Sequence, residues 1–328
     1  MKLKRKILVT GAAGYIGDAT VGFLLGVNCE VTAIDNLMYG GAYLRRHESL
    51  NFIRGDVTDE VLMEDLIREH DAVVHLAAIV GDGACQANPK LTVGVNQVAT
   101  EKIARLCSLY STRLVFASTC SVYGASNELL DENSPTNPLS LYAGTKLKAE
   151  AAVQEVPLHH IFRLGTLFGV SSDHARVRCD LVANILTYRA LAGETLSVYG
   201  GDQWRPLLHV RDAAETLALA ACGSSDPIQA GGIYVLAKDN YTILRLARVI
   251  VNVCGIQEAN IDVTELPYED QRNYKVSPDR IGSTWRCRRT LEDGIQEMAT
   301  LIREGRIADI WDISHHNARY LKEMTDVG

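Results

Sequence analysis

The stretch Thr10-Gly11-Ala12-Ala13-Gly14-Tyr15-Ile16-Gly17 decides how this chain folds. It follows the apolar run Ile7-Leu8-Val9 and opens an apolar pattern of helical spacing that extends from Tyr15 to Leu25. Glycines at this spacing end a strand, let the backbone approach a pyrophosphate, and pack a helix start against a sheet, where N-terminal N–H groups attract the anion. The stretch therefore predicts a dinucleotide-binding turn between a strand and a helix.

A carboxylate follows at the end of the next strand-like run, Val31-Thr32-Ala33-Ile34-Asp35. In that place Asp35 can accept hydrogen bonds from both ribose hydroxyls of NAD, and its charge would repel the 2′-phosphate of NADP. A glycine triplet alone is a weak signal, but strand, triplet, helix and acid together form the dinucleotide signature. We therefore expect NAD as the cofactor.

Strand-like and helical patterns alternate along the chain with the spacing of βαβ units. The expected strands are Lys6–Thr10, Glu30–Ile34, Asn51–Arg54, Ala72–Leu76, Arg113–Ser118, His159–Arg163 and Gly232–Leu236. The expected helices among them are Tyr15–Leu25, Asp59–Glu69, Thr92–Leu109, Leu141–Val156 and Arg211–Ala221. Nearly continuous apolar strands such as Leu114-Val115-Phe116-Ala117 are typical of a parallel sheet buried on both faces. The pattern predicts an α/β fold with a doubly wound parallel sheet of the Rossmann type.

The alternation ends after Gly165, where helical patterns at Leu181–Leu191, Thr242–Val253 and Leu291–Arg303 are separated by loops. These segments predict a smaller C-terminal substrate-binding domain. It is interleaved with the first domain, because Leu207–Leu236 returns to strand-helix-strand character. We expect a dinucleotide-binding domain of residues 1–165 plus about 207–236, and a substrate domain of about 166–206 plus 237–328.

Composition excludes several classes of function. The 328 residues are 47% hydrophobic and 22% charged, which suffices for the core of one large domain or two interlocked ones. The net charge of −7 provides no overall basic field, so we expect neither nucleic acid nor a membrane as a partner. Eight cysteines are scattered without a Cys-x-x-Cys pair or zinc-like spacing, which favours a reducing cytoplasm and predicts no metal site.

Candidate chemistry lies in Tyr142-Ala143-Gly144-Thr145-Lys146. Residues four apart lie on one face of a helix, so the Lys146 ammonium can approach the Tyr142 phenol. Lowering a tyrosine pKa from about 10 to near 7 needs roughly 4 kcal/mol of preferential phenolate stabilisation. Lys146 and the positive nicotinamide of an oxidised cofactor are the charges expected to supply it. Such a phenolate could remove a proton from a substrate hydroxyl while hydride leaves the same carbon.

Two further observations bear on this pair. Tyr234 and Lys238 have the same spacing, but Gly232–Leu236 is typical of a strand, in which four steps separate side chains by about 13 Å. Those two side chains cannot cooperate. The hydroxyl-rich segment that includes Thr119 follows the fifth expected strand, at the carboxyl edge where open α/β sheets bind ligands.

Six motifs in one order resemble the extended short-chain dehydrogenase/reductases that act on nucleotide sugars. They are Gly11-x-x-Gly14-x-x-Gly17, Asp35, Gly55-Asp56-Val57, His75-Leu76-Ala77-Ala78, Ser118-Thr119-Cys120-Ser121-Val122-Tyr123-Gly124 and Tyr142-x-x-x-Lys146. The resemblance covers most of the chain. It implies that Thr119 hydrogen-bonds the reacting sugar hydroxyl, that Tyr142 is the base, and that Lys146 also holds the nicotinamide ribose.

The resemblance also implies binding residues. Those expected to contact the cofactor are Gly11, Gly14, Tyr15, Ile16, Gly17, Asp35, Asn36, Asp56, Val57, Leu76, Ala77, Ala78, Tyr142 and Lys146. The substrate, a nucleotide-diphosphate sugar, is expected to contact Ser121, Arg178, Arg205 and Arg272. Arg205 is our choice for the substrate diphosphate, because guanidinium groups suit bidentate phosphate contacts.

Departures from the family pattern narrow the range of reactions that we expect. Family members that form 4-keto-6-deoxy sugars have Thr-Asp-Glu where this chain has Thr119-Cys120-Ser121, and elimination of water needs an acid and a base. A 4,6-dehydratase is therefore not expected, and Cys120 is expected to pack in the core. Phrases such as Asp35-Asn36-Leu37-Met38 and Arg178-Cys179-Asp180-Leu181 resemble the enzymes that oxidise C4 of GDP-heptoses.

The sequence thus predicts an NAD-dependent nucleotide-sugar epimerase or dehydrogenase that oxidises a sugar hydroxyl at C4. The alternative enzyme activity is that of an NDP-4-ketosugar reductase, in which the same hydride transfer occurs in the reverse direction. A non-catalytic NAD-sensing protein on the same fold is the alternative of another class, and the presence of Thr119, Tyr142 and Lys146 argues against it.

The family resemblance implies a homodimer in which the helices Thr92–Leu109 and Leu141–Val156 pair across a two-fold axis. Apolar residues outside the stripe expected to face the sheet would supply the contact. They are Leu91, Val93, Cys107, Tyr110 and Leu147.

Overall fold

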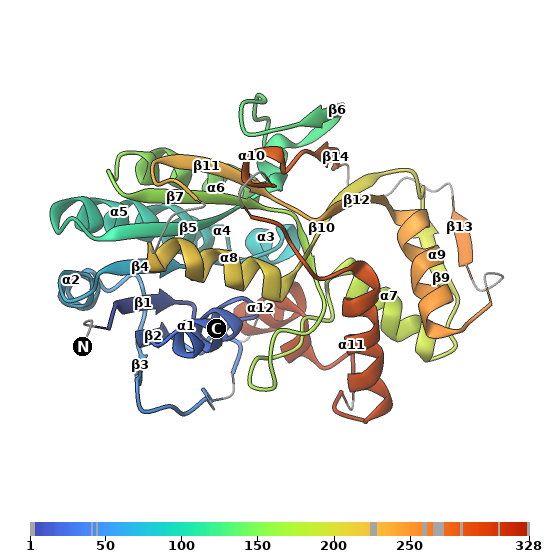
Figure 1. The fold of residues 1–328 in the computed structure, drawn as a ribbon. Coiled ribbons are helices and arrows are strands. Elements are labelled where there is room, and N and C mark those ends of the chain that lie inside the picture. Colours follow the sequence, from blue (N-terminus) through green and yellow to red (C-terminus); the bar gives the residue numbers. More distant parts are fainter. Residues whose placement is uncertain are drawn as a thin grey trace.

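Seven apolar segments pair side by side as parallel strands in the order β11-β7-β5-β4-β1-β2-β3 (Figure 1). Their bounds are β1 (Lys6–Thr10), β2 (Glu30–Asp35), β3 (Leu50–Arg54), β4 (Ala72–His75), β5 (Arg113–Thr119), β7 (His159–Leu164) and β11 (Gly232–Leu236). The computed structural model describes residues 4–40, 42–43, 45–223, 228–257, 261–264, 272–282, 285–307 and 309–326. The predicted doubly wound parallel sheet is confirmed, and each of its strands matches an expected one.

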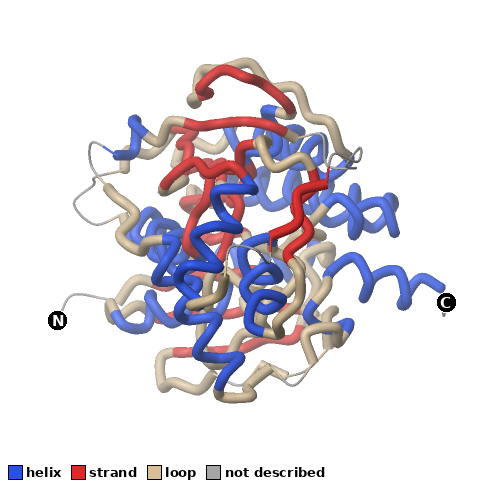
Figure 2. Tube along the Cα trace, turned by 90° about the vertical axis from the view of Figure 1, so that its right-hand side faces the viewer, coloured by secondary structure: helices blue, strands red, loops and turns tan. Residues whose placement is uncertain are grey.

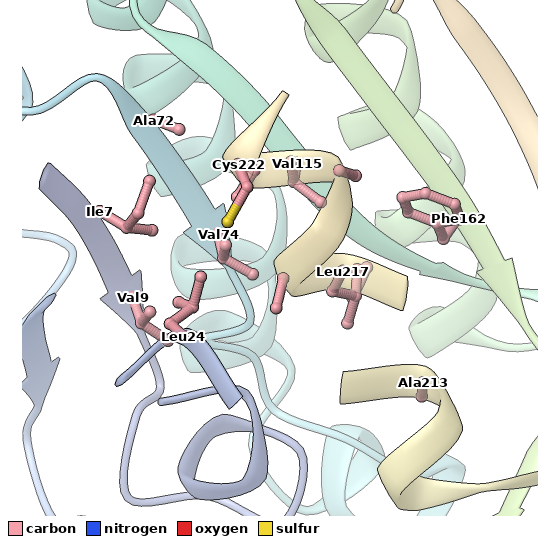
Figure 3. Close-up of a cluster of buried hydrophobic side chains, with 14 of the residues drawn as sticks. Ile7, Val9, Leu24, Ala72, Val74, Val115, Phe162, Ala213, Leu217 and Cys222 are labelled. Carbon is pink, nitrogen blue, oxygen red and sulfur yellow. The ribbon is translucent and has the colours of Figure 1, made fainter. Parts of the chain in front are cut away.

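The main sheet is buried on both faces because its side chains alternate between two cores. Ile7 and Val9 of β1 lie in a cluster with Leu217 and Cys222 of α8 (Val210–Cys222), as Figure 3 shows. Leu8, between them in sequence, joins the cluster on the opposite face. Since water reaches neither face of the inner strands β1, β4 and β5, apolar residues at successive positions of these strands are stabilising.

Helices cover both faces of this sheet (Figure 2). They are α1 (Gly17–Gly26), α2 (Glu60–Arg68), α5 (Thr100–Leu109), α6 (Leu141–Gln154) and α8. The predicted helix Thr92–Leu109 is divided into α4 (Pro89–Val93), a π-helical segment η1 (Gly94–Ala99) and α5. Within η1, Asn96 accepts a hydrogen bond from the Ile79 N–H (2.7 Å) and donates one to the Ile79 carbonyl (2.8 Å). The widened turn thereby anchors the loop that follows β4.

The later part of the chain forms smaller sheets and helices beyond one end of the main sheet (Figure 1). One small sheet combines β8 (Thr166–Phe168), β10 (Trp204–His209) and β12 (Asp239–Thr242), and a second pairs β9 (Leu196–Tyr199) with β13 (Ile261–Thr264). A third pairs β6 (Ala125–Leu130) with β14 (Asn273–Val276). The helices α7 (Val182–Leu191), α9 (Ile243–Cys254) and α11 (Leu291–Arg303) pack around a separate apolar core. The division of the chain into two domains stays a prediction.

Two helices that the sequence did not predict pack against each other at the carboxyl edge of the main sheet. They are α3 (Asp82–Ala87), which follows β4, and α12 (Asn317–Asp326). The remaining short helices are η2 (Cys120–Tyr123), α10 (Asp279–Gly282) and η4 (Ile313–His315). Among the described residues, no helix is long and apolar enough to cross a membrane.

Candidate active site

The glycine-rich turn approaches neighbouring backbone so closely that side chains are excluded. A Cβ on Gly11 would lie 2.7 Å from the Ala77 backbone nitrogen, and one on Gly17 would lie 2.1 Å from the Gly11 carbonyl oxygen. Gly11 also has φ +67°, a conformation that glycine adopts without strain. The turn is therefore held against the end of β4 and leaves the start of α1 open toward a ligand.

A cavity of about 500 Å³ lies beside this turn, within the size range of cofactor pockets. Twelve of the fourteen predicted cofactor contacts line it. They are Gly11, Gly14, Tyr15, Ile16, Gly17, Asp35, Asn36, Asp56, Val57, Leu76, Ala77 and Ala78. Tyr142 and Lys146, the other two, are not among its lining residues. Loops after four neighbouring strands thus line one cavity, as a dinucleotide site requires.

Asp35 is fixed at one end of the cavity by backbone donors. One carboxylate oxygen accepts the Ala13 N–H (3.0 Å) and the other accepts the Leu37 N–H (2.8 Å). Burial raises the pKa of Asp35, and these N–H groups together with the Arg176 charge oppose that effect. Each carboxylate oxygen keeps further acceptor capacity, so the group remains suited to ribose hydroxyls.

The sequence did not identify Tyr39, Arg176 and Asn317, which also line the cavity. The Arg176 guanidinium lies 4.1 Å from the centre of the Tyr39 ring and donates to the Asn317 side-chain oxygen and the Ser314 carbonyl. The Tyr39 hydroxyl is buried without a hydrogen-bond partner among the described residues. Burial raises the pKa of Tyr39 to about 12, so this hydroxyl is a donor for a ribose or phosphate oxygen. The cavity residues therefore fit a dinucleotide.

Thr119 and Tyr142 bring two hydroxyl groups together. Thr119 ends β5 and caps η2, where its hydroxyl accepts the Ser121 N–H (3.1 Å). Tyr142 lies in the first turn of α6, whose N-cap Ser140 accepts the Ala143 N–H (3.2 Å). β5 packs against α6, and the Thr119 side chain opposes the rise of the Tyr142 pKa. The structure thereby places two hydroxyl groups, either of which can donate or accept a proton, near each other at the carboxyl edge of the sheet.

The expected lowering of the Tyr142 pKa by Lys146 is not what the protein alone produces. Burial raises the pKa of Tyr142, and the nearby acids Cys85 and Asp82 add to the rise. The Thr119 hydrogen bond and the Arg178 charge oppose it. Without a further positive charge the phenol stays protonated.

Lys146 is buried at 3% exposure, one helical turn after Tyr142. Its nitrogen lies 4.0 Å from the centre of the Phe116 ring. Burial lowers the pKa of Lys146 to about 7, while the Glu150 carboxylate opposes this effect. An amine of that pKa gains or loses its proton near neutral pH.

A buried ion pair supports these residues from beneath, and the sequence analysis missed it. Glu150 pairs with Arg163 of β7, with 2.8 Å between Oε2 and Nη2, and it accepts the Ser118 hydroxyl. Arg163 also donates to the Tyr123 hydroxyl (3.1 Å). A glutamate four residues after Lys146 and an arginine inside an apolar strand were the available signals.

Three of the four predicted substrate residues lie together. Arg272 Nη1 is 3.4 Å from the Ser121 hydroxyl, and Arg205 donates to the Arg272 carbonyl. Arg178 lies apart from them, because it lines the cofactor cavity and pairs with Asp180 (2.5 Å). The predicted substrate set therefore occupies two places, and only Ser121, Arg205 and Arg272 form one cluster.

Cys120 packs in the core, as predicted. It is fully buried, and its thiol donates to the Arg163 carbonyl (3.2 Å). Burial raises the pKa of this thiol, so it does not supply a thiolate. All eight cysteines are free thiols.

Comparison with known proteins places this geometry in context. Residues 7–237 match the model of the NAD dependent epimerase/dehydratase family. A dTDP-glucose 4,6-dehydratase from an Actinoplanes species is 30% identical over 92% of this chain and 98% of its own length. A crystallised dTDP-glucose 4,6-dehydratase from Streptomyces venezuelae, with NAD bound, is 25% identical with a TM-score of 0.80, covering 94% of this chain and 99% of that one. A Thermus thermophilus UDP-glucose 4-epimerase, also with NAD, is 27% identical with a TM-score of 0.75, covering 91% and 99%.

Proposed function

Because the chain belongs to the NAD dependent epimerase/dehydratase family, we propose that it is a nucleotide-sugar epimerase or dehydrogenase that oxidises the C4 hydroxyl of the sugar. The cofactor is NAD, and the relatives of this protein are enzymes that act on nucleotide sugars. The observation that carries the proposal is the placement of Thr119, at the end of β5, and Tyr142, in the first turn of α6 packed against β5, on the sheet edge that also forms the cofactor cavity.

In the proposed reaction, Thr119 holds the sugar hydroxyl and Tyr142 takes its proton. NAD, when bound, accepts the hydride from the carbinol carbon and brings a positive ring that favours the phenolate. Lys146, one helical turn after Tyr142, holds the nicotinamide ribose. Return of the hydride to the other face of the ketone gives epimerisation, and release of the ketone gives net oxidation.

Ser121, Arg205 and Arg272 form the proposed site for the diphosphate and the adjoining sugar. Guanidinium groups bind phosphate oxygens in pairs, and two of them are joined here through the Arg272 carbonyl. Arg178 is proposed to contact the substrate from the cofactor side.

The reaction that we propose is not a 4,6-elimination. Removal of water needs an acid and a base close to C5 and C6. Cys120 is buried with its thiol protonated, and Ser121 has a hydroxyl in place of a carboxylate. Cys120 and Ser121 therefore do not supply the acid and the base that elimination of water needs.

The second candidate is an NDP-4-ketosugar reductase, in which Tyr142 acts as the acid. A protonated phenol donates a proton to a carbonyl oxygen as hydride arrives, which is the reverse of the oxidation. The residues and their places are the same in both directions.

One experiment tests both candidates. The purified protein is incubated with UDP-, GDP-, CDP- and dTDP-sugars and NAD, and separately with the corresponding 4-ketosugars and NADH; absorbance is followed at 340 nm, and the products are identified. Oxidation or epimerisation of one nucleotide sugar supports the proposal, and turnover only of a ketosugar with NADH supports the reductase. A protein that binds NAD but turns over neither kind of substrate would be the non-catalytic sensor.

We also propose a homodimer in a reducing cytoplasm. The pairing surface combines α4, η1, α5 and α6. One expected contact needs correction, because Cys107 is fully buried within its own chain, whereas Leu91, Val93, Tyr110 and Leu147 are partly exposed. Val98 on η1, at 40% exposure, adds apolar surface. Free thiols throughout are consistent with a reducing compartment.

A further inference from the structure

We propose that Asp82 contacts the sugar of the substrate and selects neutral sugars over uronic acids. The inference rests on the proposed function, because it concerns the same nucleotide-sugar site. Asp82 is the first residue of α3, a helix that the sequence did not predict, and it follows Gly81, whose φ is +100°.

The position of Asp82 is fixed by its contact with a predicted substrate residue. Its Oδ2 lies 3.4 Å from Arg272 Nη1, and the same nitrogen lies 3.4 Å from the Ser121 hydroxyl. Both side chains of the pair are 29% exposed, so the ion pair itself contributes little stability. The carboxylate therefore belongs to the substrate cluster, and structural stabilisation does not account for it.

Asp82 also lies close to the reacting pair. Its helix, α3, packs against α6, which carries Tyr142, and the Asp82 charge acts on the Tyr142 phenol. In a nucleotide-diphosphate sugar, the sugar ring is the part that separates the diphosphate from the reacting hydroxyl. A carboxylate that neighbours both Arg272 and Tyr142 is therefore placed beside the ring.

One oxygen of Asp82 lacks a partner. Oδ1 is buried and has no hydrogen bond within the described part of the chain. A buried acceptor without a donor is costly and uncommon in folded proteins. The Asp82 side chain is 29% exposed, so a sugar hydroxyl can donate to the accessible part of the carboxylate, whereas a sugar carboxylate brings a second negative charge and is repelled.

The test compares binding of three ligands by calorimetry, with NAD present. The nucleoside diphosphate that binds best among UDP, GDP, CDP and dTDP is chosen first. Its neutral sugar conjugate and its uronic acid conjugate are then titrated, for example UDP-glucose and UDP-glucuronate or GDP-mannose and GDP-mannuronate. Wild-type protein, Asp82→Asn and Asp65→Asn are compared. Asp65 is an exposed residue of α2 and controls for the change in net charge.

We expect the wild-type protein to bind the neutral conjugate at least about tenfold more tightly than the uronate, and Asp82→Asn to reduce this ratio severalfold. Asp65→Asn should leave the ratio unchanged. The free nucleoside diphosphate should bind to wild type and Asp82→Asn within about twofold.

Other outcomes separate the two proposals. Equal affinity of wild type for both conjugates would overturn the role of Asp82. Equal weakening of all three ligands by Asp82→Asn would also overturn it, because Asp82 would then act only by orienting Arg272. If no nucleoside diphosphate binds, the proposed function itself fails, and the assignment of Asp82 fails with it.

Discussion

Arg163 and Glu150 form an ion pair inside the protein, with 2.8 Å between Nη2 and Oε2 and side-chain exposures of 5% and 1%. Glu150 lies one helical turn after Lys146 and also accepts the hydroxyl of Ser118, which precedes Thr119. The pair therefore joins β5, α6 and β7 directly beneath the residues proposed for catalysis.

Replacing Glu150 by Gln should lower the free energy of unfolding by about 3 kcal/mol or more, because the Arg163 charge stays buried without its counter-ion. Urea denaturation followed by circular dichroism measures the loss. The exposed pair of Arg68 and Asp65 is the control, and Asp65→Asn should cost less than about 1 kcal/mol. Similar losses in both variants would contradict the assigned role.

His75 should make the protein less stable in acid. It is buried between Thr10 (2.8 Å) and Thr100 (3.0 Å), and burial lowers its pKa from 6.5 to about 3. Between these values the unfolded chain binds a proton at His75 that the folded chain does not. The free energy of unfolding therefore falls as pH falls through this window, by up to about 1.4 kcal/mol per pH unit from this residue.

The variant His75→Asn removes that dependence. Its free energy of unfolding should be lower at pH 8, where hydrogen bonds are lost, and the difference from wild type should shrink between pH 6 and pH 4. Denaturation curves at several pH values measure both effects. If the difference in free energy of unfolding between wild type and His75→Asn stays constant down to pH 4, His75 does not titrate on unfolding.

Tyr142→Phe should bind NAD as wild type does but lose at least about 100-fold in turnover, the usual contribution of a positioned acid or base. The matched control is Tyr234→Phe. Tyr234 precedes Lys238 by the same four residues, but it lies on β11 and its hydroxyl donates to the Gln229 carbonyl (2.7 Å). Turnover should persist in the control. Near-normal turnover of Tyr142→Phe would remove Tyr142 from the mechanism.

NAD should bind at least about tenfold more tightly than NADP, because the Asp35 carboxylate at the cavity wall repels a 2′-phosphate. Asp35→Asn keeps an oxygen that can accept the Ala13 or Leu37 N–H and should reduce the preference. Calorimetry with both cofactors gives the ratio. Equal dissociation constants in wild type would show that Asp35 does not set the choice; Arg176, a cation of the cavity wall whose charge acts on Asp35, would then offset its effect.

Light scattering at micromolar concentration should give a mass near twice the 35.9 kDa of one chain. A charge at Val98, as in Val98→Asp, should shift the protein toward the monomer, because it would be buried at the pairing surface. Val61 is 73% exposed on α2, outside that surface, so Val61→Asp serves as the control. A wild-type mass near that of one chain would rule out the dimer under these conditions.

The main sheet and its turn were predictable because their signals are local. Strands such as β1, β4 and β5 have uninterrupted apolar runs, and the glycines of the turn are close in sequence. The same holds for Tyr142 and Lys146, which one helix carries. Short elements were missed for the opposite reason: the α3 segment, Asp82–Ala87, has six residues and too few turns to show helical spacing.

The cavity wall of Tyr39, Arg176 and Asn317 could not be predicted, since each comes from a different loop or terminal segment and only the fold brings them together. The pKa of Tyr142 in the protein alone could not be predicted either. Spacing indicated that Lys146 shares a helix face with Tyr142, but burial is the largest influence on the phenol and is a property of the folded state.

The residues that line the cofactor cavity determine when, during translation, the protein can bind NAD. In sequence, the last strand of the main sheet ends at Leu236, whereas Ser314 and Asn317, which also line the cavity, come about eighty residues later. The sheet can therefore assemble on the ribosome while the cavity is still open on one side. We expect NAD to be captured firmly only after that late segment has emerged, so a stalled chain would fold its sheet and still release its cofactor.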